Sequence, residues 1–212
     1  VITRDQIERA GATSVNDLLK LTAGVDVRQR GGFGVQSDIS INGGSFDQIT
    51  VLLNGVPINN PQTGHLVSDF PVSPDEIERI EILEGAAGRL FGSQAFSGAI
   101  NVVTRKVVKN SLHADVAAGS YGTVGGGANI GLKTEGFTHF LSGNFTRSDG
   151  GTENSAFNLG NAFYNGTYKS HDIHASWQTG LAAKEYGANT FYSAAYPNQW
   201  ESNTRIFASA KA

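Results

Sequence analysis

The second half of the chain has the feature that most constrains the fold, an alternation of apolar and polar residues. From Leu112 onward a period of two dominates and helical periodicity is absent. These stretches are roughly 8 to 11 residues long, and Gly-, Asn- and Ser-rich turns separate them. A period of two places successive side chains on opposite faces of a strand. The pattern predicts antiparallel strands, either of a membrane-spanning barrel with aromatic residues near the strand ends or of a soluble sandwich.

Composition excludes several classes of protein. The net charge of -3 and the pI of about 5.9 provide no basic field for nucleic acid. The chain has no cysteine, so disulfides and thiolate metal sites are excluded. No apolar run approaches the roughly 20 residues of a membrane-spanning helix. The 27 glycines and only 5 prolines indicate many tight turns rather than extended linkers.

The first half reads as mixed α and β. Thr3 to Gln6 and Ser14 to Asp17 each have the spacing of a capping box, which predicts two short helices, and we expect the second to end at Gly24. Val25 and Val27 then begin an extended segment. Further signals follow: a glycine-rich turn at 30–34, half-buried strands around Ile39–Ile41 and Ile49–Leu53, a tight turn at Asn54-Gly55, a polar loop at Pro57–Pro71, a helix start at Ser73-Pro74, and strands around Ile80–Ile82 and Ala99–Thr104.

The first 106 residues contain an ordered set of motifs, at 1–7, 14–19, 24–27, 51–59, 77–85 and 89–105. Together these motifs resemble the plug of TonB-dependent outer-membrane transporters. Among the branches of that family, the chain looks nearest to the vitamin B12 (cobalamin) transporters, especially from Val1 to Asp26.

The resemblance implies a fold and a domain organisation. We expect an α+β plug domain with a short mixed sheet and small helices at 1–106, followed by antiparallel transmembrane β-barrel strands at 107–212. About five strands fit after Lys106, whereas a barrel that holds a plug uses about 22, so we expect an incomplete barrel. Val1-Ile2-Thr3 runs straight into a helix start, so we also expect an export signal and the TonB box to lie upstream.

The same resemblance implies active import of a scarce nutrient across the bacterial outer membrane, with the plug gating the barrel. The implied partners are TonB, outer-membrane lipid and a small ligand such as cobalamin, haem or a ferric siderophore, with a surface lipoprotein as an open addition. No nucleic acid, cofactor or metal is expected. Because no bond is made or broken, no catalytic residue is expected either. A soluble plug-like recognition module without transport is the alternative, and an enzyme has the weakest basis in the sequence.

Two plug loops are expected at the outer mouth, where ligand binds. Their uncharged donors and acceptors suit a large amide-rich ligand, while Arg30 and Phe33 could clamp and stack on it. Solvated loop residues without a ligand remain the alternative for each of them. The expected substrate-binding residues are Arg30, Phe33, Gln36, Asn59, Asn60, Gln62, Thr63 and His65.

Some patterns argue against other sites. His171 and His174 are expected on one strand, where residues three apart face opposite sides, so they do not form a metal pair. Asn42 precedes Gly43 where many plugs of the family have arginine, and Glu84-Gly85-Ala86 stands where they often have Arg-Gly-Pro. In the family these arginines are implicated in docking the plug to carboxylates of the barrel wall. The resemblance therefore does not imply that interaction at these positions of this chain. Residues 186–200 are aromatic and polar, which predicts an extracellular loop or an aromatic girdle.

Overall fold

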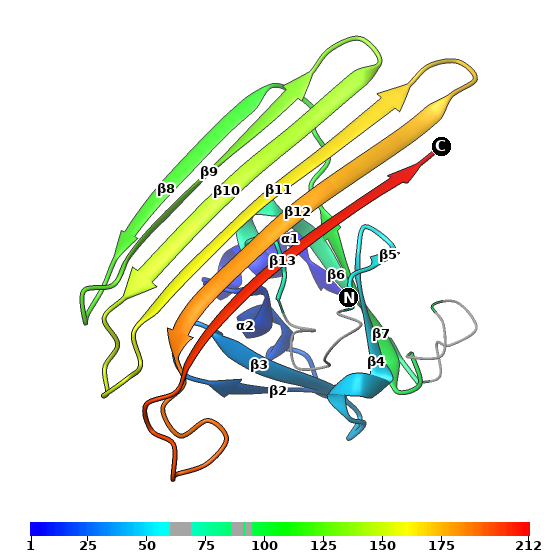
Figure 1. Ribbon diagram of the computed structural model, residues 1–212. Helices are drawn as coiled ribbons and strands as arrows, with labels where there is room; N and C mark the ends of the chain where they lie inside the picture. Colours follow the sequence, from blue (N-terminus) through cyan, green and yellow to red (C-terminus); the bar gives the residue numbers. More distant parts are fainter. Residues whose placement is uncertain (60–68, 86–90, 92–94) are drawn as a thin grey trace. The chain divides into compact units, whose positions relative to one another are not determined.

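In a computed structural model, the chain divides into two units, Val1–Arg105 and Lys106–Ala212. The structure describes residues 1–59, 69–85, 91 and 95–212. The first unit combines short helices, a mixed sheet and a hairpin, and the second is built from long strands and their turns (Figure 1). Among the described residues, no helix is long and apolar enough to cross a membrane.

The first helix, α1 (Arg4–Ala10), begins where its sequence signal predicts. Thr3 caps it, and the Thr3 backbone N–H donates to Oε1 of Gln6 at 2.9 Å, the reciprocal half of a capping box. Ile7 is the buried residue of the helix. Gly11 ends the helix in the left-handed region, with φ of 58°, which glycine adopts without a steric penalty. The expected helix start is therefore confirmed.

The second helix, α2 (Val15–Leu19), also begins as expected but ends earlier. The hydroxyl of Ser14 accepts from the backbone N–H of Asp17 at 3.2 Å and so satisfies one of the free donors of the first turn. The helix closes at Lys20, and the next two N–H groups bond carbonyls three residues back, which forms a tight turn. The expected end at Gly24 is wrong, because that residue, with φ of 82°, instead turns the chain into the next strand.

The main sheet of the first unit is mixed. Its β4 (Ile49–Leu53) and β7 (Gly98–Thr104) run parallel, and its other pairs run antiparallel. The 3-10 helix η1 (Phe46–Gln48) leads into β4. The strand order is β1 (Ile2–Thr3), β6 (Ile77–Glu84), β7 (Gly98–Thr104), β4 (Ile49–Leu53) and β5 (Val56–Pro57).

Strand β4 is buried along its whole length. The alternation of Ile49, Val51 and Leu53 predicts a half-buried strand, but Thr50 and Leu52 are buried as well. The strand pairs with β7 on one side and β5 on the other, and Leu52 belongs to a cluster with Ala95 and Ala99. The half-buried assignment is therefore wrong, because both faces of this strand are covered.

The turn after β4 has the expected geometry. Asn54 and Gly55 take φ angles of 52° and 76°, the positive values that a two-residue hairpin requires. Nδ2 of Asn54 donates to Oγ1 of Thr104 at 3.0 Å, and the Thr104 backbone N–H donates to Oδ1 of Asn54 at 2.9 Å. The residue Asn54 thus forms the turn, and its side chain bonds the end of β7.

Replacing Asn54 by alanine should lower the free energy of unfolding of this region by about 2 kcal/mol, because it removes two part-buried hydrogen bonds and places alanine at positive φ. Hydrogen–deuterium exchange of peptides from β4 and β7, in the full-length protein, measures the loss. Asn54→Asp is the matched control, since aspartate keeps a hydrogen-bond acceptor and also tolerates a positive φ. This variant should lose less exchange protection than Asn54→Ala. Equal protection in all three proteins would contradict the assigned role.

Two expectations between β4 and β6 need correction. Pro57 was expected at the start of a polar loop, but it forms strand β5 with Val56, and Ile58 after it is buried. A proline is accommodated there because β5 is an edge strand. The helix start at Ser73 yields only one 3-10 turn, η3 (Pro74–Glu76), since the strand begins at once with Ile77.

A carboxylate on β6 is stabilised by its neighbours. Nδ2 of Asn101 donates to Oε2 of Glu81 at 2.8 Å, and Nε of Arg79 donates to Oε1 at 2.7 Å. The hydrogen bond from Asn101, followed by that from Arg79, holds the pKa of Glu81 below its ordinary value. Oδ1 of the same asparagine accepts from the N–H of Gly55 at 2.9 Å, so the group links β6 to the hairpin turn.

This lowered pKa predicts a loss of stability in acid. The ionised Glu81 stabilises the folded state fully when the pH is above the pKa of an unfolded glutamate, about 4.3. This stabilisation is lost as the pH falls through the lower pKa that Glu81 has in the folded state. Glu81→Gln should therefore flatten the decline in protection of β6 and β7 between about pH 6 and pH 3. Hydrogen-exchange protection factors across that range measure it. Glu78→Gln, at an exposed position of the same strand, is the control and should show the same decline in protection as the wild-type protein. If Glu78→Gln flattened the decline as much as Glu81→Gln, Glu81 would be excluded as its cause.

The remaining strands of the first unit form a separate hairpin. Strand β2 (Val25–Arg30) pairs antiparallel with β3 (Gln36–Ile41), in register from Val25 opposite Ile41 to Arg30 opposite Gln36. Ile39 and Ile41 are buried, as the alternation predicts. In the turn, residues 31–33 are exposed, whereas Gly34 and Val35 are buried.

The second unit is a single antiparallel meander whose strands lie side by side in chain order (Figure 1). The expected number of about five strands is too low, since six are present. Short turns at 134–136 and 170–173 occupy one end, called here the short-turn end, and loops at 119–123, 149–156 and 188–199 occupy the long-loop end. The strands are β8 (Ser111–Ala118), β9 (Val124–Lys133), β10 (Phe137–Ser148), β11 (Phe157–Lys169), β12 (His174–Gly187) and β13 (Trp200–Lys211).

Candidate functional site

The tip of the β2–β3 hairpin brings together the first group of expected ligand residues. Gly31, Phe33 and Gly34 all have positive φ, at 73°, 52° and 69°. A left-handed conformation is costly for a bulky residue such as Phe33, yet its side chain remains 45% exposed rather than serving as a core anchor. An exposed aromatic ring held in a strained turn is a reasonable contact surface for a ligand.

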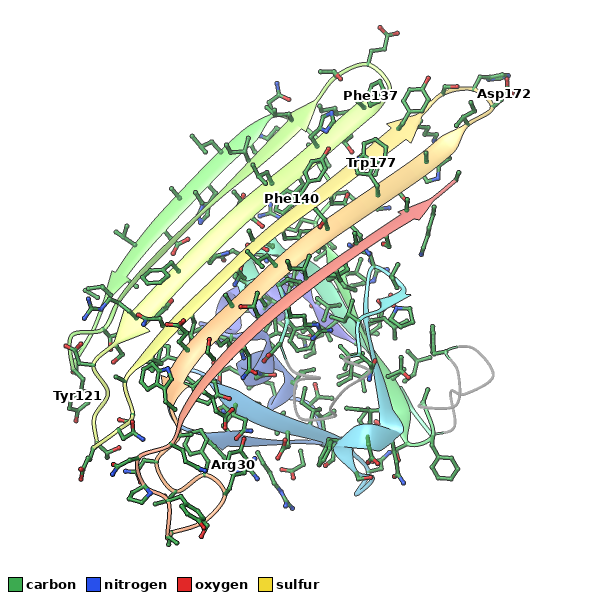
Figure 2. The ribbon with its side chains drawn as sticks, viewed as in Figure 1. Arg30, Tyr121, Phe137, Phe140, Asp172 and Trp177 are labelled. Carbon is green, nitrogen blue, oxygen red and sulfur yellow. The ribbon has the colours of Figure 1, made fainter. Side chains whose placement is uncertain are left out.

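Arg30 stands at the base of that turn (Figure 2). Its Nη1 lies 2.8 Å from Oδ2 of Asp38 and 3.5 Å from Oε1 of Gln36, both on the opposite strand. The Arg30 side chain is one-third exposed, while Gln36 is buried. The arginine is therefore held in place by β3 and still presents part of its guanidinium to solvent.

Asn59 has a different setting. Its Oδ1 accepts from the backbone N–H of Val51 at 2.8 Å, and its Nδ2 donates to the carbonyl of Ile49 at 3.0 Å. The side-chain amide thus continues the ladder of β4 where the backbone of β5 has ended. Asn60, Gln62, Thr63 and His65, the other residues of the expected second loop, lie outside the described residues.

The two positions that depart from the family pattern contact each other. Nδ2 of Asn42 donates to Oε2 of Glu84 at 3.3 Å, and the Asn42 backbone N–H donates to the carbonyl of Gly24 at 2.8 Å. An amide and a carboxylate therefore form a neutral–anionic pair inside the first unit, at positions where the resemblance would have placed cations. Sequence spacing gave no sign of this contact, because it joins residues 42 apart.

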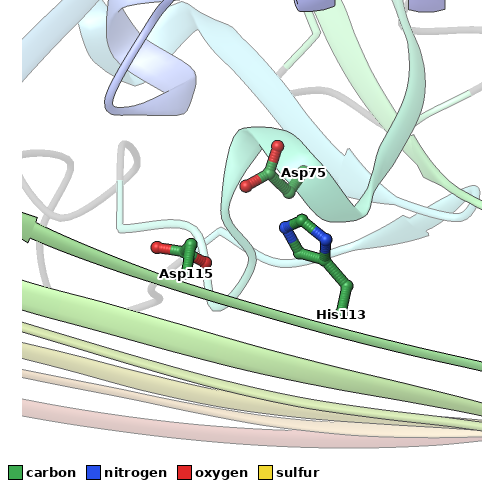
Figure 3. Close-up of side chains that lie close together, drawn as sticks. All are labelled: Asp75, His113 and Asp115. Carbon is green, nitrogen blue, oxygen red and sulfur yellow. The ribbon is translucent and has the colours of Figure 1, made fainter.

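Potential metal ligands are spread over both units. Asp75 belongs to η3 of the first unit, whereas His113 and Asp115 lie two residues apart on β8, on one face of the second sheet (Figure 3). All three are exposed. His171 was expected on a strand with His174, but it lies in the turn before β12, so that placement is wrong.

The six-stranded sheet has one face that is almost entirely apolar, called here the outer face. Register and alternation place Leu112, Ile130, Leu141 and Tyr164 in one row across four strands. Leu141 is 53% exposed, and Val116, two rows away, is 91% exposed. An apolar face this large and this open is unusual in a protein surrounded by water.

The apolar band on the outer face has two borders. At the long-loop end a polar row crosses four strands, with Arg147, Asn158, Glu185 and Ser202 in register. At the short-turn end an aromatic row begins with Phe137 opposite Tyr168, whose ring centroids are 4.5 Å apart. No Asp, Glu, Lys or Arg lies on the outer face between these two rows.

The height of this band matches a membrane. On β11 the border rows stand at Asn158 and Tyr168, ten residues apart, which corresponds to about 34 Å along an extended strand. Strands of outer-membrane barrels tilt by about 40°, so the band would be about 26 Å tall, close to the roughly 25 Å apolar band of such barrels.

The opposite, inner face is polar. Nδ2 of Asn144 donates to Oδ1 of Asn161 at 3.2 Å across neighbouring strands. The ring centroids of Phe140 and Phe163, which lie on this face, are 6.5 Å apart. The register also places Phe157, Tyr186 and Phe207 on this face. Alternation of an apolar outer face with a more polar inner face is the pattern of a barrel with a water-filled or filled lumen.

A hydrogen-bonded group on the outer face was missed by sequence reasoning. His139, Tyr164 and Trp177 come from three successive strands and meet near the short-turn end. In the sequence Tyr164 is 25 positions from His139 and 13 positions from Trp177. Only the strand register brings them together, so register, rather than any local motif, could have revealed the group.

Comparison with known proteins agrees with the two-part architecture. Residues 1–99 match the family model of the TonB-dependent receptor plug domain. The vitamin B12 transporter BtuB of Vibrio vulnificus (strain CMCP6) is 39% identical over 104 residues, which are 49% of this chain and 17% of that protein. The chain therefore spans about a sixth of the length of this relative.

Solved structures extend the likeness beyond the plug. The unliganded ferric citrate transporter FecA superposes with a TM-score of 0.70 at 22% identity, over 89% of this chain and 31% of that chain. The pyoverdine outer membrane receptor FpvA of Pseudomonas aeruginosa PAO1 superposes with a TM-score of 0.69 at 16% identity, over 86% of this chain and 27% of that chain.

The sheet topology and the comparisons together define the fold. The chain has the fold of a TonB-dependent outer-membrane receptor, a mixed-sheet plug followed by antiparallel strands of a barrel that is not closed. Its residues 1–99 are similar to the plug domain of TonB-dependent receptors.

Proposed function

We propose that the chain is part of an active importer of the bacterial outer membrane, in which a plug gates a barrel and TonB supplies the energy. Residues 1–106 would be the plug, and residues 107–212 would be the first strands of the barrel. The observation that carries this proposal is the outer face of the second sheet, an exposed apolar band of membrane height between an aromatic and a polar row. No chemical step is needed, so the protein would not be an enzyme.

The alternative of a soluble recognition module is disfavoured by the same band. Leu112, Val116, Leu141 and Ile206 would face water in such a module, and each is more than half exposed. A contiguous apolar face of this kind promotes aggregation in water but is stabilised by hydrocarbon. Outer-membrane lipid is therefore the proposed surrounding of the second unit.

The transported nutrient is proposed from the relatives. The likeness to a vitamin B12 transporter covers the plug, which favours cobalamin. The likeness to a ferric citrate transporter and to a pyoverdine receptor favours a ferric siderophore, and haem belongs to the same range of scarce nutrients. Within the plug, Arg30 and Phe33 would contact the ligand, and Gln36 would position the arginine.

The second proposed loop would complete the ligand surface. The side-chain amide of Asn59 already bonds backbone groups of β4, so this residue would support the loop rather than contact the ligand through its amide. Asn60, Gln62, Thr63 and His65 remain proposed ligand contacts. A surface lipoprotein remains a proposed further partner.

Equilibrium binding to the full-length protein in detergent tests this proposal. We expect one of labelled cobalamin, haem or a ferric siderophore to bind at micromolar concentration or below. The double substitution Arg30→Ala and Phe33→Ala should weaken binding about 100-fold, if each contact contributes the amount typical of a well-placed interface group. Arg28→Ala, an exposed arginine on the same strand, should leave affinity unchanged.

Two outcomes would contradict the proposal at different levels. Binding without any effect of Arg30 and Phe33 would remove the hairpin tip from the site but keep the importer. Absence of binding by all three nutrient classes, together with TonB-independent growth on each of them, would remove the importer itself.

A further inference from the structure

The chain contains three Asn-Gly dipeptides, and the fold places them in different surroundings. They are Asn42-Gly43, Asn54-Gly55 and Asn165-Gly166. In such a pair the backbone nitrogen of the glycine can reach the side-chain carbonyl carbon of the asparagine, and glycine has no Cβ to hinder that approach. The first two pairs form turns with positive φ, whereas the third lies inside β11, which has a neighbouring strand on each side.

Asn42-Gly43 forms an exposed turn after β3. The N–H of Gly44 donates to the carbonyl of Ile41 at 2.9 Å, and the two central residues have φ of 49° and 78°, as in a type I′ turn. Within the part of the chain that the structure describes, the N–H of Gly43 has no hydrogen-bond partner. Nothing lies within 4 Å of a Cβ added to Gly43, so the peptide plane has room to rotate and water can approach it.

The side chain of Asn42 is held only weakly. Its Nδ2 donates to Oε2 of Glu84 at 3.3 Å, and both residues are exposed. A rotation of the peptide plane between Asn42 and Gly43 converts a type I′ turn into type II′, because both types have a positive φ at the first central residue. This rotation leaves the ends of the turn in place and brings the Gly43 nitrogen toward Cγ of Asn42.

The turn at Asn54-Gly55 has the same dipeptide but is held by hydrogen bonds. The Asn54 amide donates to Oγ1 of Thr104 at 3.0 Å and accepts from the Thr104 backbone N–H at 2.9 Å. The N–H of Gly55 donates to Oδ1 of Asn101 at 2.9 Å. An approach of the Gly55 nitrogen to Cγ of Asn54 would break these bonds, so this turn is an internal control for the first.

We propose that Asn42 is a site of spontaneous covalent modification, which converts it into a mixture of aspartate and isoaspartate. The Gly43 nitrogen gives up its proton and attacks Cγ of Asn42, and the new N–Cγ bond closes a cyclic imide. The side-chain nitrogen takes up a proton and leaves as ammonia. Water, the one co-reactant, then opens the imide: hydrolysis at Cγ gives aspartate, and hydrolysis at the backbone carbonyl gives isoaspartate. No oxidation or reduction occurs.

The modification would change both the charge and the backbone at the base of the β2–β3 hairpin. A carboxylate at position 42 would face the carboxylate of Glu84 in place of the donor Nδ2, and like charges repel. Isoaspartate would also insert its Cβ into the backbone, next to the hydrogen bond from the Asn42 N–H to the carbonyl of Gly24 at 2.8 Å. We therefore expect the modified protein to have a loosened hairpin.

Mass spectrometry of the full-length protein, aged in detergent at mildly alkaline pH, tests the site. Peptides that contain Asn42 should gain the mass of deamidation and take up oxygen from isotopically labelled water, and their fragmentation should show isoaspartate as well as aspartate. Asn54 should react about 100-fold more slowly in the folded protein, the factor that three hydrogen bonds of ordinary strength give. In urea, where the fold is lost, the two sites should react at similar rates.

Asn101→Ala combined with Thr104→Val separates the hydrogen bonds from other effects of the fold. The double variant removes the acceptor of the Gly55 N–H and the hydroxyl beside Asn54, so the rate at Asn54 should rise about tenfold while the rate at Asn42 stays unchanged. Equal rates at Asn42 and Asn54 in the folded wild-type protein, or no reaction at Asn42, would overturn the proposal. If the variant fails to fold, this comparison within the wild-type protein still decides.

Hydrogen exchange tests the effect on the hairpin. Asn42→Asp should raise the exchange of β2 and β3 peptides about fivefold, the factor that one lost hydrogen bond gives. Asn42→Asp combined with Glu84→Gln exchanges donor and acceptor, so it should restore protection. Unchanged exchange in Asn42→Asp, or no rescue by Glu84→Gln, would contradict the expected charge effect. Neither experiment uses a nutrient or TonB, so this inference and the proposed function can fail separately.

Discussion

Leu141→Arg is expected to prevent most of the full-length protein from folding into lipid vesicles. Leu141 lies in the middle of the apolar band, in the row with Ile130 and Tyr164 and two rows from the aromatic border. An arginine at the midplane of an outer-membrane barrel costs about 2 to 4 kcal/mol. Urea titration of folding into vesicles, followed by the mobility shift of the folded barrel on gels, measures the loss.

Two controls separate lipid exposure from general disruption of β10. Leu141→Phe keeps an apolar side chain at the same position and should fold like the wild-type protein. Asn144→Arg places the same charge on the inner face, where polar residues already line the sheet, and should cost much less. A loss in Asn144→Arg as large as in Leu141→Arg would contradict the assignment of the two faces.

Gly98→Ala should destabilise the plug by about 3 kcal/mol. A Cβ at this position would lie 2.4 Å from the carbonyl oxygen of Leu83 and 3.0 Å from Cδ1 of Ile41, with φ of 158°. The first neighbour is backbone of the adjacent strand β6, which cannot move without breaking the ladder between β6 and β7. Hydrogen exchange of β6 and β7 peptides should rise sharply, while peptides of the second unit should be unchanged.

Gly11→Ala is the control for Gly98→Ala. Gly11 also has a positive φ, but nothing lies within 4 Å of its added Cβ, so only the backbone strain of about 1 kcal/mol remains. If both variants lost protection equally, close backbone approach would not be the reason for glycine at position 98.

The sequence predicted those features of the fold that depend only on residues close together in the chain. The capping box at Thr3, the cap at Ser14 and the Asn54-Gly55 turn each depend on residues within three positions, and all three are confirmed. The α+β class of the first unit and the antiparallel strands of the second are confirmed too. Periodicity sufficed for the second unit because each strand has one apolar and one polar face.

Features that depend on contacts between residues far apart in the sequence could not be predicted from local signals. The complete burial of β4 follows from neighbours far along the chain, and the Asn42–Glu84 contact joins residues 42 apart. The count of about five strands was too low because two turns use only residues 134–136 and 170–173. Half of the proposed ligand residues, including His65, lie outside the described part of the chain, so their roles remain proposals.

The contact of the outer face with lipid can be measured most directly by nitroxide scanning along β10. The chain has no cysteine, so single cysteines at positions 139 to 146 can be labelled one at a time in the full-length protein in vesicles, after removal of any cysteine elsewhere. We expect accessibility to oxygen to peak at 141, 143 and 145 and to fall at 142 and 144, with the opposite ranking for a water-soluble nickel complex. Equal accessibility at odd and even positions, or low oxygen accessibility at 141 and 145, would contradict a lipid-facing sheet.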